Sequence, residues 1–225
     1  MTMEPRATLV DLSHAVHDGL VTYPGLPAPA IGEHLDRAAS RAHYAPGTEF
    51  SIGRIAMVAN TGTYLDAPFH RYADGKDLSQ LELESLADLD GLVVRALERG
   101  RALGPELFRG KRLDGRAVLV HTGWARHFGT AQYGAGHPFL TEAAAEALLA
   151  GGVRLVGIDS LNIDDTAGGA RPVHSRLLAR DVRIVEHLTG LERLPDEGFR
   201  FFAVPVKVRG MGSFPVRAFA RVERA

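Results

Sequence analysis

Residues 60–70 of the chain read NTGTYLDAPFH, a stretch that follows an apolar, strand-like run and has a turn at Gly62. Asp66 and His70 are four residues apart, with Pro68 between them. Because proline lacks a backbone donor and fixes φ, we expect a rigid loop or turn here rather than a regular helix. A carboxylate and an imidazole on a rigid segment suit metal binding or proton transfer. An Asp that caps a turn above a packed His explains this segment equally well.

The composition of the chain narrows the possible chemistry. The 225 residues include 26 Lys+Arg, 27 Asp+Glu, ten His and no Cys, and 45% are hydrophobic. This balance is typical of a globular protein, and a net charge of -1 argues against nucleic acid as a partner. The lack of Cys excludes a disulfide scaffold, a Cys-ligated metal and a thiol nucleophile. We therefore expect metal or acid–base chemistry to use His, Asp, Glu, Ser, Thr and Tyr.

The apolar runs of the chain are short. None approaches the about 20 residues that a membrane helix needs. Residues 1–10 lack the long apolar core of a signal peptide. We therefore expect no membrane contact and a cytoplasmic location.

The order of the apolar runs predicts an α/β fold with a mixed sheet flanked by helices, in one domain over residues 1–225. Two helices are expected, Thr141–Ala150 with Thr141 as its N-cap, and Pro172–Ala179. Strands outnumber helices, which favours a mixed sheet over strict βαβ alternation. The expected strands are Ala7–Leu12, Ile52–Ala59, Gly91–Ala96, Ala117–His121, Leu155–Ile158, Ile184–Glu186, Arg200–Val208 and Val216–Val222.

A second pair of candidate residues lies in the last quarter of the chain. His174 falls in the second expected helix, and Glu186 ends an apolar strand. A carboxylate at the end of such a strand is costly to bury unless it is paired or bound to a metal. The alternative is that Glu186 is the acidic first residue of a new helix.

These motifs, taken in order, resemble the cyclase family of metal-dependent hydrolases, which includes bacterial kynurenine formamidase and isatin hydrolase. The family frame His-x-Gly-Thr-His-x-Asp-x-Pro-x-His is matched here from Asn60 to His70, with Asn60 and Tyr64 in place of two His. The further matches are DLS at 11–13, YPG at 23–25, HTGW at 121–124, HP at 137–138, GID at 157–159, His174, Glu186-x-Leu188 and GSFPVR at 212–217.

The resemblance implies a fold and an activity. The fold is a swivelling β/β/α domain in a homodimer or homotetramer. The activity is hydrolysis of a C–N bond in a small aromatic or cyclic amide, and kynurenine formamidase, an enzyme of tryptophan catabolism, is the first example to consider.

The resemblance also implies a metal site. It places one divalent metal, zinc or manganese, on Asp66, His174 and Glu186. The second metal of the family would need His at positions 60 and 64. An amide is a poor ligand, and a phenol with an ordinary pKa of about 10 must lose its proton to bind well. We therefore expect the second metal site to be lost through Asn60 and Tyr64.

Other roles follow from the same alignment of motifs. His70 occupies the position of the proton-shuttling His, and an imidazole with a pKa of about 6.5 suits that task. Tyr64 is a second candidate catalytic residue. Tyr23, Asn60 and His121 are candidates for substrate binding, although a structural or supporting role explains His121, at the end of an apolar strand, better than a site role does.

Two other functions fit the same residues. In the first, no metal binds: Asp66 orients His70, and Tyr64 with Asn60 stabilises an oxyanion, which suits a cyclase or isomerase. In the second, the chain is a catalytically silent homologue that binds a small molecule. We favour the hydrolase, because Asp66, His174 and Glu186 would otherwise form a poorly compensated acidic cluster.

Overall fold

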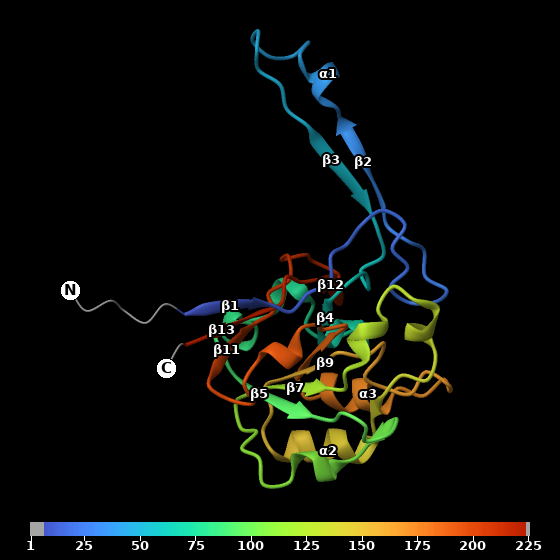
Figure 1. The fold of residues 1–225 in the computed structure, drawn as a ribbon, viewed down its shortest axis with the longest axis vertical. Coiled ribbons are helices and arrows are strands. Elements are labelled where there is room, and N and C mark those ends of the chain that lie inside the picture. Colours follow the sequence, from blue (N-terminus) through green and yellow to red (C-terminus); the bar gives the residue numbers. More distant parts are fainter. Residues whose placement is uncertain (1–6, 224–225) are drawn as a thin grey trace, which may run out of the picture.

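The computed structural model describes residues 7–223. Its main element is a mixed sheet of nine strands (Figure 1). The strand order is β1-β13-β11-β5-β7-β9-β10-β4-β12. The bounds are β1 Thr8–Asp11, β4 Tyr64–Asp66, β5 Leu89–Arg95, β7 Ala117–His121, β9 Leu155–Ile158, β10 Arg183–Glu186, β11 Phe199–Phe202, β12 Ser213–Pro215 and β13 Phe219–Val222.

The centre of the sheet is parallel. Strands β5, β7, β9 and β10 pair in parallel, whereas β4 and β12 on one side and β11, β13 and β1 on the other pair antiparallel. Strands β7 and β9 are buried along their whole length, which explains their uninterrupted apolar sequences. Because parallel strands end at the same edge, Glu186 at the end of β10 and Asp159 just after β9 lie along one edge of the sheet.

Both expected helices are present. Helix α2 covers Glu142–Ala150, and the Thr141 hydroxyl accepts a hydrogen bond from the backbone N–H of Ala144 at 3.2 Å, as an N-cap does. Helix α3 covers Pro172–Leu178. The apolar sides of both helices join one of the two buried clusters of the core, together with residues of β5, β7 and β9.

The segment 60–70 differs from the expected loop. Tyr64–Asp66 forms β4, which lies between β10 and β12, and Pro68–His70 forms a 3-10 turn. The expectation was wrong for Tyr64–Asp66 because three residues carry too little pattern to reveal a strand. Pairing on both sides supplies the hydrogen bonds that make it one.

A protruding arm, residues 30–56, is the most conspicuous departure from the predicted fold (Figure 1). Strands β2 (Ala30–Leu35) and β3 (Ile52–Ala56) form a separate two-stranded sheet, and the short helix α1 (Arg37–Ser40) lies toward its tip. The expected strand Ile52–Ala59 was therefore wrong in extent and in placement, since it ends at Ala56 and lies outside the main sheet. Strand β2 was not expected.

Two other expected strands are shorter than predicted. The run Arg200–Val208 leaves the sheet after Phe202, and the run Val216–Val222 contributes only β13, from Phe219. Pro205 lacks the N–H that a longer strand would use, and it takes part only in an isolated bridge to Val216. A small parallel pair, β6 (Ala102–Leu103) and β8 (Phe139–Leu140), completes the fold.

The helices within the described residues are all too short or too polar to cross a bilayer.

Candidate active site

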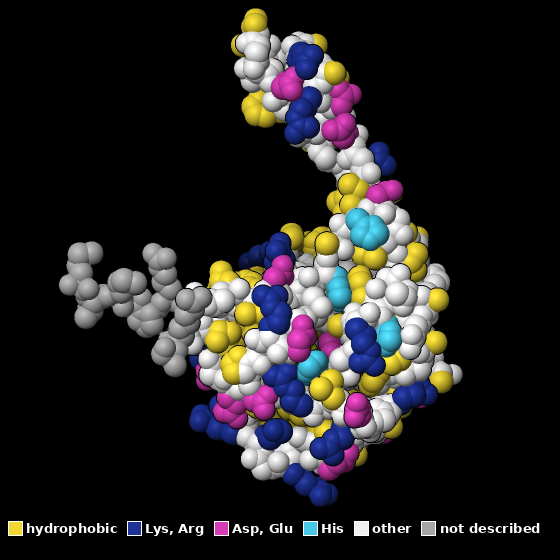
Figure 2. Space-filling model, in the orientation of Figure 1, with side chains coloured by type: hydrophobic (Ala, Val, Ile, Leu, Met, Phe, Trp, Pro, Cys, Tyr) yellow, Lys and Arg dark blue, Asp and Glu magenta, His cyan; other side chains and the backbone are white. Residues whose placement is uncertain are grey.

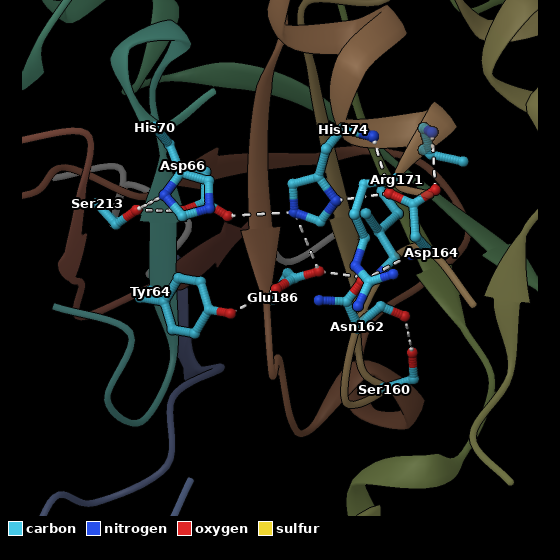
Figure 3. Close-up of polar contacts among 12 residues, drawn as sticks. Tyr64, Asp66, His70, Ser160, Asn162, Asp164, Arg171, His174, Glu186 and Ser213 are labelled. Carbon is cyan, nitrogen blue, oxygen red and sulfur yellow. Dashed lines mark hydrogen bonds and ion pairs between the residues drawn. The ribbon is translucent and has the colours of Figure 1, made fainter. Parts of the chain in front are cut away.

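Four titratable side chains meet where β4, β10 and α3 come together (Figure 3). Asp66 ends β4, His70 ends the turn that follows, His174 comes from α3 and Glu186 ends β10. Asp66 and Glu186 are fully buried, His174 is 5% exposed, and the His70 side chain is 37% exposed. The site therefore has a buried acidic floor and an imidazole open to solvent.

The register of β4 against β10 creates the acidic floor. Asp66 lies opposite Ile184, and Tyr64 lies opposite Glu186. Residues two apart on a strand share a face, so Tyr64, Asp66 and Glu186 project from the same face of the sheet. The Tyr64 hydroxyl consequently donates to Glu186 Oε2 at 2.5 Å, and the backbone N–H of Ile163 donates to Oε1 of the same carboxylate at 2.6 Å.

His174 is oriented by a third buried carboxylate, that of Asp164. Its Nδ1 lies 2.7 Å from Asp164 Oδ2, and the backbone N–H groups of Val173 and His174 donate to the same carboxylate at 2.8 and 3.0 Å. The opposite nitrogen, Nε2, therefore faces Asp66 Oδ2 at 3.6 Å and Glu186 Oε1 at 3.7 Å. A metal-binding His usually donates its other ring N–H to a carboxylate, which is the arrangement of His174 and Asp164.

His70 is oriented by Ser213, which lies between it and Asp66. The Ser213 hydroxyl donates to Asp66 Oδ1, and His70 Nδ1 lies 2.8 Å from the same Ser213 oxygen. A hydroxyl has one proton, and a carboxylate only accepts, so Ser213 must accept from His70 Nδ1–H. This assigns the neutral tautomer of His70 with its proton on Nδ1 and leaves Nε2 free to accept a proton.

The electrostatics of the cluster favour a cation. Burial acts against protonation of His174, but the carboxylates of Asp164, Asp66 and Glu186 raise its pKa to about 10. Burial raises the pKa of Glu186 to about 7, and His174 opposes that rise. Burial also disfavours the charged form of Asp66, yet His70, His174 and Ser213 hold its pKa below the ordinary value. The acidic groups around His174 thus favour a positive charge at that position.

The residues fit a divalent metal ion. Asp66 Oδ2 is buried and has no hydrogen-bond partner, although it faces His174 Nε2. Ligand atoms of Asp66, His70 and His174 lie within 4.8 Å of one another, close enough to bind one ion. Among the described residues this group contains His70 in place of Glu186, the third predicted ligand, whose Oε1 lies 3.7 Å from His174 Nε2. Nitrogen and carboxylate oxygen donors suit zinc or manganese.

The structure brings together five of the predicted site residues: Tyr64, Asp66, His70, His174 and Glu186. A sixth, Asn60, lies beside Tyr64, and its side chain lowers the pKa of the Tyr64 hydroxyl against the larger effect of burial, which raises it. His121 is not part of this cluster. Its contacts are with Arg95, which donates to its Nδ1 at 2.9 Å, and with Asp159, which lies 4.0 Å from its Nε2. Tyr23 lies in the segment before the arm, and no hydrogen bond or ring contact joins its side chain to the cluster within the described residues.

Two residues of the site, Asp164 and Ser213, were not among the candidate catalytic, metal-binding or substrate-binding residues. Asp164 lies eight positions before the first residue of α3, whose N-cap position is Arg171, yet its carboxylate accepts from the backbone N–H groups of Val173 and His174. Because Asp164 is not at the N-cap position, no local capping signal marks it in the sequence. Ser213 had no signal beyond the motif at 212–217, because its contacts with Asp66 and His70 span more than 140 residues of sequence.

A group of aromatic and imidazole rings packs next to Tyr64. The His187 ring is 5.1 Å from the Tyr64 ring, and its Nδ1 is 2.8 Å from the Tyr133 hydroxyl. The His14 ring stacks on Phe128 at 3.6 Å, and Phe128 meets Tyr133 edge-on. These rings pack one against the next on the side of Tyr64 where His187 lies.

Comparison with known proteins gives the family of the chain. The family model described as "Putative cyclase" matches residues 10–165, which is more than half of the chain. The chain belongs to the cyclase family. The kynurenine formamidase of Maricaulis maris (strain MCS10) is 27% identical over 216 residues, covering 96% of this chain and 98% of the relative. The kynurenine formamidase of Bacillus cytotoxicus is 24% identical over 221 residues, covering 94% and 96%.

Solved structures give the same fold. Isatin hydrolase A from Labrenzia aggregata, bound to benzyl benzoate, superimposes with a TM-score of 0.82 at 22% identity, covering 97% of this chain and 94% of that one. An isatin hydrolase bound to the product analogue thioisatinate gives 0.81 at 21% identity, covering 97% and 93%. The predicted family and α/β fold class are confirmed. The prediction of an enzyme is confirmed too, since the matched relatives are named for hydrolytic reactions.

Proposed function

We propose that this cyclase-family protein is a metal-dependent amide hydrolase that cleaves the C–N bond of a small aromatic amide, either linear or cyclic. Family membership and the hydrolytic relatives support the reaction class. The observation that carries the proposal is the placement of His174, whose Nε2 faces Asp66 and Glu186 while Asp66 Oδ2 has no hydrogen-bond partner. A metal ion bound between these groups would give Asp66 Oδ2 the partner that it lacks.

Asp66, His174 and Glu186 are the proposed ligands of one zinc or manganese ion. When bound, the ion supplies Lewis acidity, which lowers the pKa of a water molecule to about 7 and polarises a carbonyl group. His174 must release its Nε2 proton to act as a ligand, and Asp164 retains the proton on Nδ1. Glu186 accepts two hydrogen bonds and, as a carboxylate, has further acceptor capacity.

His70 is the proposed proton shuttle. Ser213 holds the proton on Nδ1, so Nε2 can take a proton from the attacking water and return it to the leaving nitrogen. The His70 side chain is partly exposed, so a substrate can reach it. Asp66 and Glu186 are fully buried.

Tyr64 has a positioning role in this scheme. Its hydroxyl donates to Glu186, so the phenol proton is already committed. In the metal-free alternative, the Tyr64 hydroxyl must donate that proton to an oxyanion. The proposed hydrolase mechanism does not use the Tyr64 proton. Burial, followed by the negative charges of Glu186 and Asp66, raises the pKa of Tyr64 and keeps the phenol protonated, which is why we propose that the second metal site is lost.

Several features of this assignment come from the resemblance and the relatives. We propose Tyr23 and Asn60 as substrate contacts, whereas His121 would act only through Arg95 and Asp159. The substrate would be an aromatic or cyclic amide, such as the N-formyl aromatic amines that formamidases cleave. The proposed setting is cytoplasmic, and the proposed assembly is a homodimer or homotetramer.

Metal content and turnover test the proposal together. The purified protein, supplied with zinc or manganese, should bind one equivalent per chain and hydrolyse a member of a panel of N-formyl aromatic amines and cyclic amides. His174→Ala should lose the metal. His70→Ala should keep the metal and lose turnover by about 100- to 10,000-fold.

Three outcomes would count against parts of this scheme. Loss of metal in His70→Ala would make His70 a ligand. A protein that binds no metal at saturating supply would favour the metal-free cyclase or isomerase, and metal binding without turnover of any amide would favour a silent binding protein.

A further inference from the structure

A short segment between β9 and α3 places Asn162 at the candidate active site (Figure 3). The next residue, Ile163, donates its backbone N–H to Glu186 Oε1 at 2.6 Å, which holds the segment against one of the proposed ligands. In Figure 3, Asn162 and His70 lie on opposite sides of Glu186. The segment therefore adds an amide side chain to the site, on the side away from the proposed proton shuttle.

A ligand can enter the site from the side of His70. The His70 side chain is 37% exposed, whereas Asn162 is only 6% exposed. On the face drawn in Figure 2, imidazole side chains reach the surface of the body close to acidic ones. A molecule that contacts His70 and extends inward past Glu186 therefore reaches Asn162 (Figure 3).

The orientation of the Asn162 amide is set by the residue two positions further on. Its Oδ1 accepts from the backbone N–H of Asp164 at 2.9 Å, and an amide nitrogen could not accept there. Nδ2 is therefore the other end of the group, with two N–H donors. Within the described residues, no hydrogen bond uses either donor. An acceptor on a bound molecule would satisfy donors that the chain itself leaves unused.

The other side-chain donors of the site are directed at acceptors within the chain. These donors are the hydroxyls of Tyr64 and Ser213 and the Nδ1 atoms of His70 and His174. The Asn60 amide is hydrogen-bonded to the Tyr64 hydroxyl. Among the side chains of the site, Asn162 is thus the one with two uncommitted donors.

Hydrolysis of an amide creates a negative charge on the carbonyl oxygen. In the proposed reaction, water adds to the carbonyl carbon, His70 Nε2 takes a proton from that water, and the π electrons of the C=O bond move to the oxygen. When the C=O bond forms again, the C–N bond breaks and the leaving nitrogen takes the proton from His70. The carboxylates of Asp66 and Glu186 disfavour a further negative charge nearby, whereas a fixed N–H donor stabilises it.

We propose that Asn162 Nδ2 donates to the carbonyl oxygen of the bound amide and to the oxyanion that forms from it. This role rests on the proposed hydrolase function and adds a catalytic residue to it. It also defines how the substrate lies. The carbonyl oxygen is on the Asn162 side of the site, and the leaving nitrogen is on the His70 side (Figure 3).

The substitution Asn162→Ser separates the donor of this amide from its acceptor. A Ser hydroxyl can accept from the N–H of Asp164, as Asn162 Oδ1 does, but it is too short to replace Nδ2. Metal content and the thermal unfolding midpoint should match the wild type, while kcat for an N-formyl aromatic amine should fall by about 100- to 1,000-fold. Gln132→Ala is the control, because Gln132 is an exposed amide, and its kcat should equal that of the wild type.

An N-thioformyl aromatic amine distinguishes a donor from a merely structural residue. This substrate has sulfur in place of the carbonyl oxygen, and sulfur is a weak hydrogen-bond acceptor. With it, Asn162→Ser should lose only about 10-fold in kcat or less, because the wild type gains little from the donor. A structural defect would slow both substrates equally.

The Asn content of the chain allows a measurement on the wild type that does not depend on turnover. The chain has only two Asn, Asn60 and Asn162, so isotope labelling of Asn gives two side-chain NH2 signals in an NMR spectrum, and Asn162→Ser assigns them. Phenylboronic acid takes up hydroxide to become a tetrahedral anion that resembles the adduct of water with an amide. Its binding should move an Asn162 Nδ2 proton downfield.

The outcomes separate this proposal from the proposed function. A wild-type kcat in Asn162→Ser, equal losses for the oxygen and sulfur substrates, or unchanged Asn162 signals at saturating phenylboronic acid would overturn the donor role. A wild type that shows the shift but hydrolyses no amide would overturn the hydrolase and support the donor. A wild type that neither hydrolyses an amide nor binds the acid would overturn both.

Discussion

His70 Nδ1 lies 2.8 Å from the hydroxyl of Ser213, which itself donates to Asp66. The direction of these two hydrogen bonds fixes which ring nitrogen of His70 carries the proton. A buried carboxylate thus controls the tautomer of the exposed imidazole through one hydroxyl group. Removing that hydroxyl should change proton transfer more than it changes substrate binding.

The first prediction concerns Ser213→Ala. Without the hydroxyl, His70 Nδ1–H loses its acceptor and the ring loses its preferred tautomer, so kcat should fall by about 10- to 100-fold. KM and metal content should stay close to the wild-type values. Steady-state kinetics and elemental analysis check both expectations. Ser213→Thr retains a hydroxyl and should recover a large part of kcat, and a Thr variant as slow as the Ala variant would contradict the tautomer argument.

Asp164→Asn should weaken metal binding. Asp164 accepts from His174 Nδ1 at 2.7 Å and from two backbone N–H groups, and an amide oxygen is a weaker acceptor than a carboxylate. We expect metal affinity to fall by about 10- to 100-fold, measured by competition with a chelator. Asp165→Asn is the control, since Asp165 is a neighbouring acid whose side chain is 39% exposed. Equal losses in both variants would show that general charge, not His174 orientation, sets the affinity.

A double substitution, Asn60→His with Tyr64→His, should create a second metal site. The present Tyr64 hydroxyl donates to Glu186 at 2.5 Å, and Asn60 offers only an amide. Two imidazoles in these positions would be good ligands beside Glu186 and Asp66. The metal content should rise from one to two equivalents per chain. Asn60→Gln with Tyr64→Phe provides no new ligand and should remain at one, and two equivalents in that control or in the wild type would refute the expected loss of the second site.

The stability of the fold should fall in acid partly through His14. Burial lowers the pKa of His14 to about 4, against an ordinary value of 6.5, and its Nε2 is buried without a hydrogen-bond partner. Between these two values the unfolded chain binds the proton and the folded chain does not. The free energy of unfolding therefore decreases as the pH falls from 6.5 to about 4, and this contribution is constant above 6.5.

The substitution His14→Phe isolates this contribution, because it retains a ring to stack on Phe128. Urea unfolding at a series of pH values should show a shallower loss of stability between pH 6.5 and 4 than in the wild type. The exposed His17 provides the control, and His17→Phe should leave the slope as it is. A wild-type slope in His14→Phe would mean that other groups account for the acid sensitivity.

The success of the fold prediction depended on burial. The runs Ala117–His121 and Leu155–Ile158 are buried on both faces, so nearly every residue is apolar and the strands are evident in the sequence. Strands β2 and β3 are exposed on both faces and carry no such pattern. Strand β4 has only three residues and owes its conformation to pairing with β10 and β12.

The amino-acid sequence by itself determined the class of fold, the family and the donor chemistry, because apolar runs, ordered motifs and the lack of Cys are local properties of the chain. It also showed that positions 60 and 64 carry Asn and Tyr. Only the tertiary structure decided which donors meet and how they are protonated. The register of β4 on β10 sets Asp66 and Glu186 on one face, while Asp164 and Ser213 orient the two imidazoles. Hydrogen-bond direction depends on distances between segments far apart in sequence, and those distances exist only once the sheet and α3 have packed.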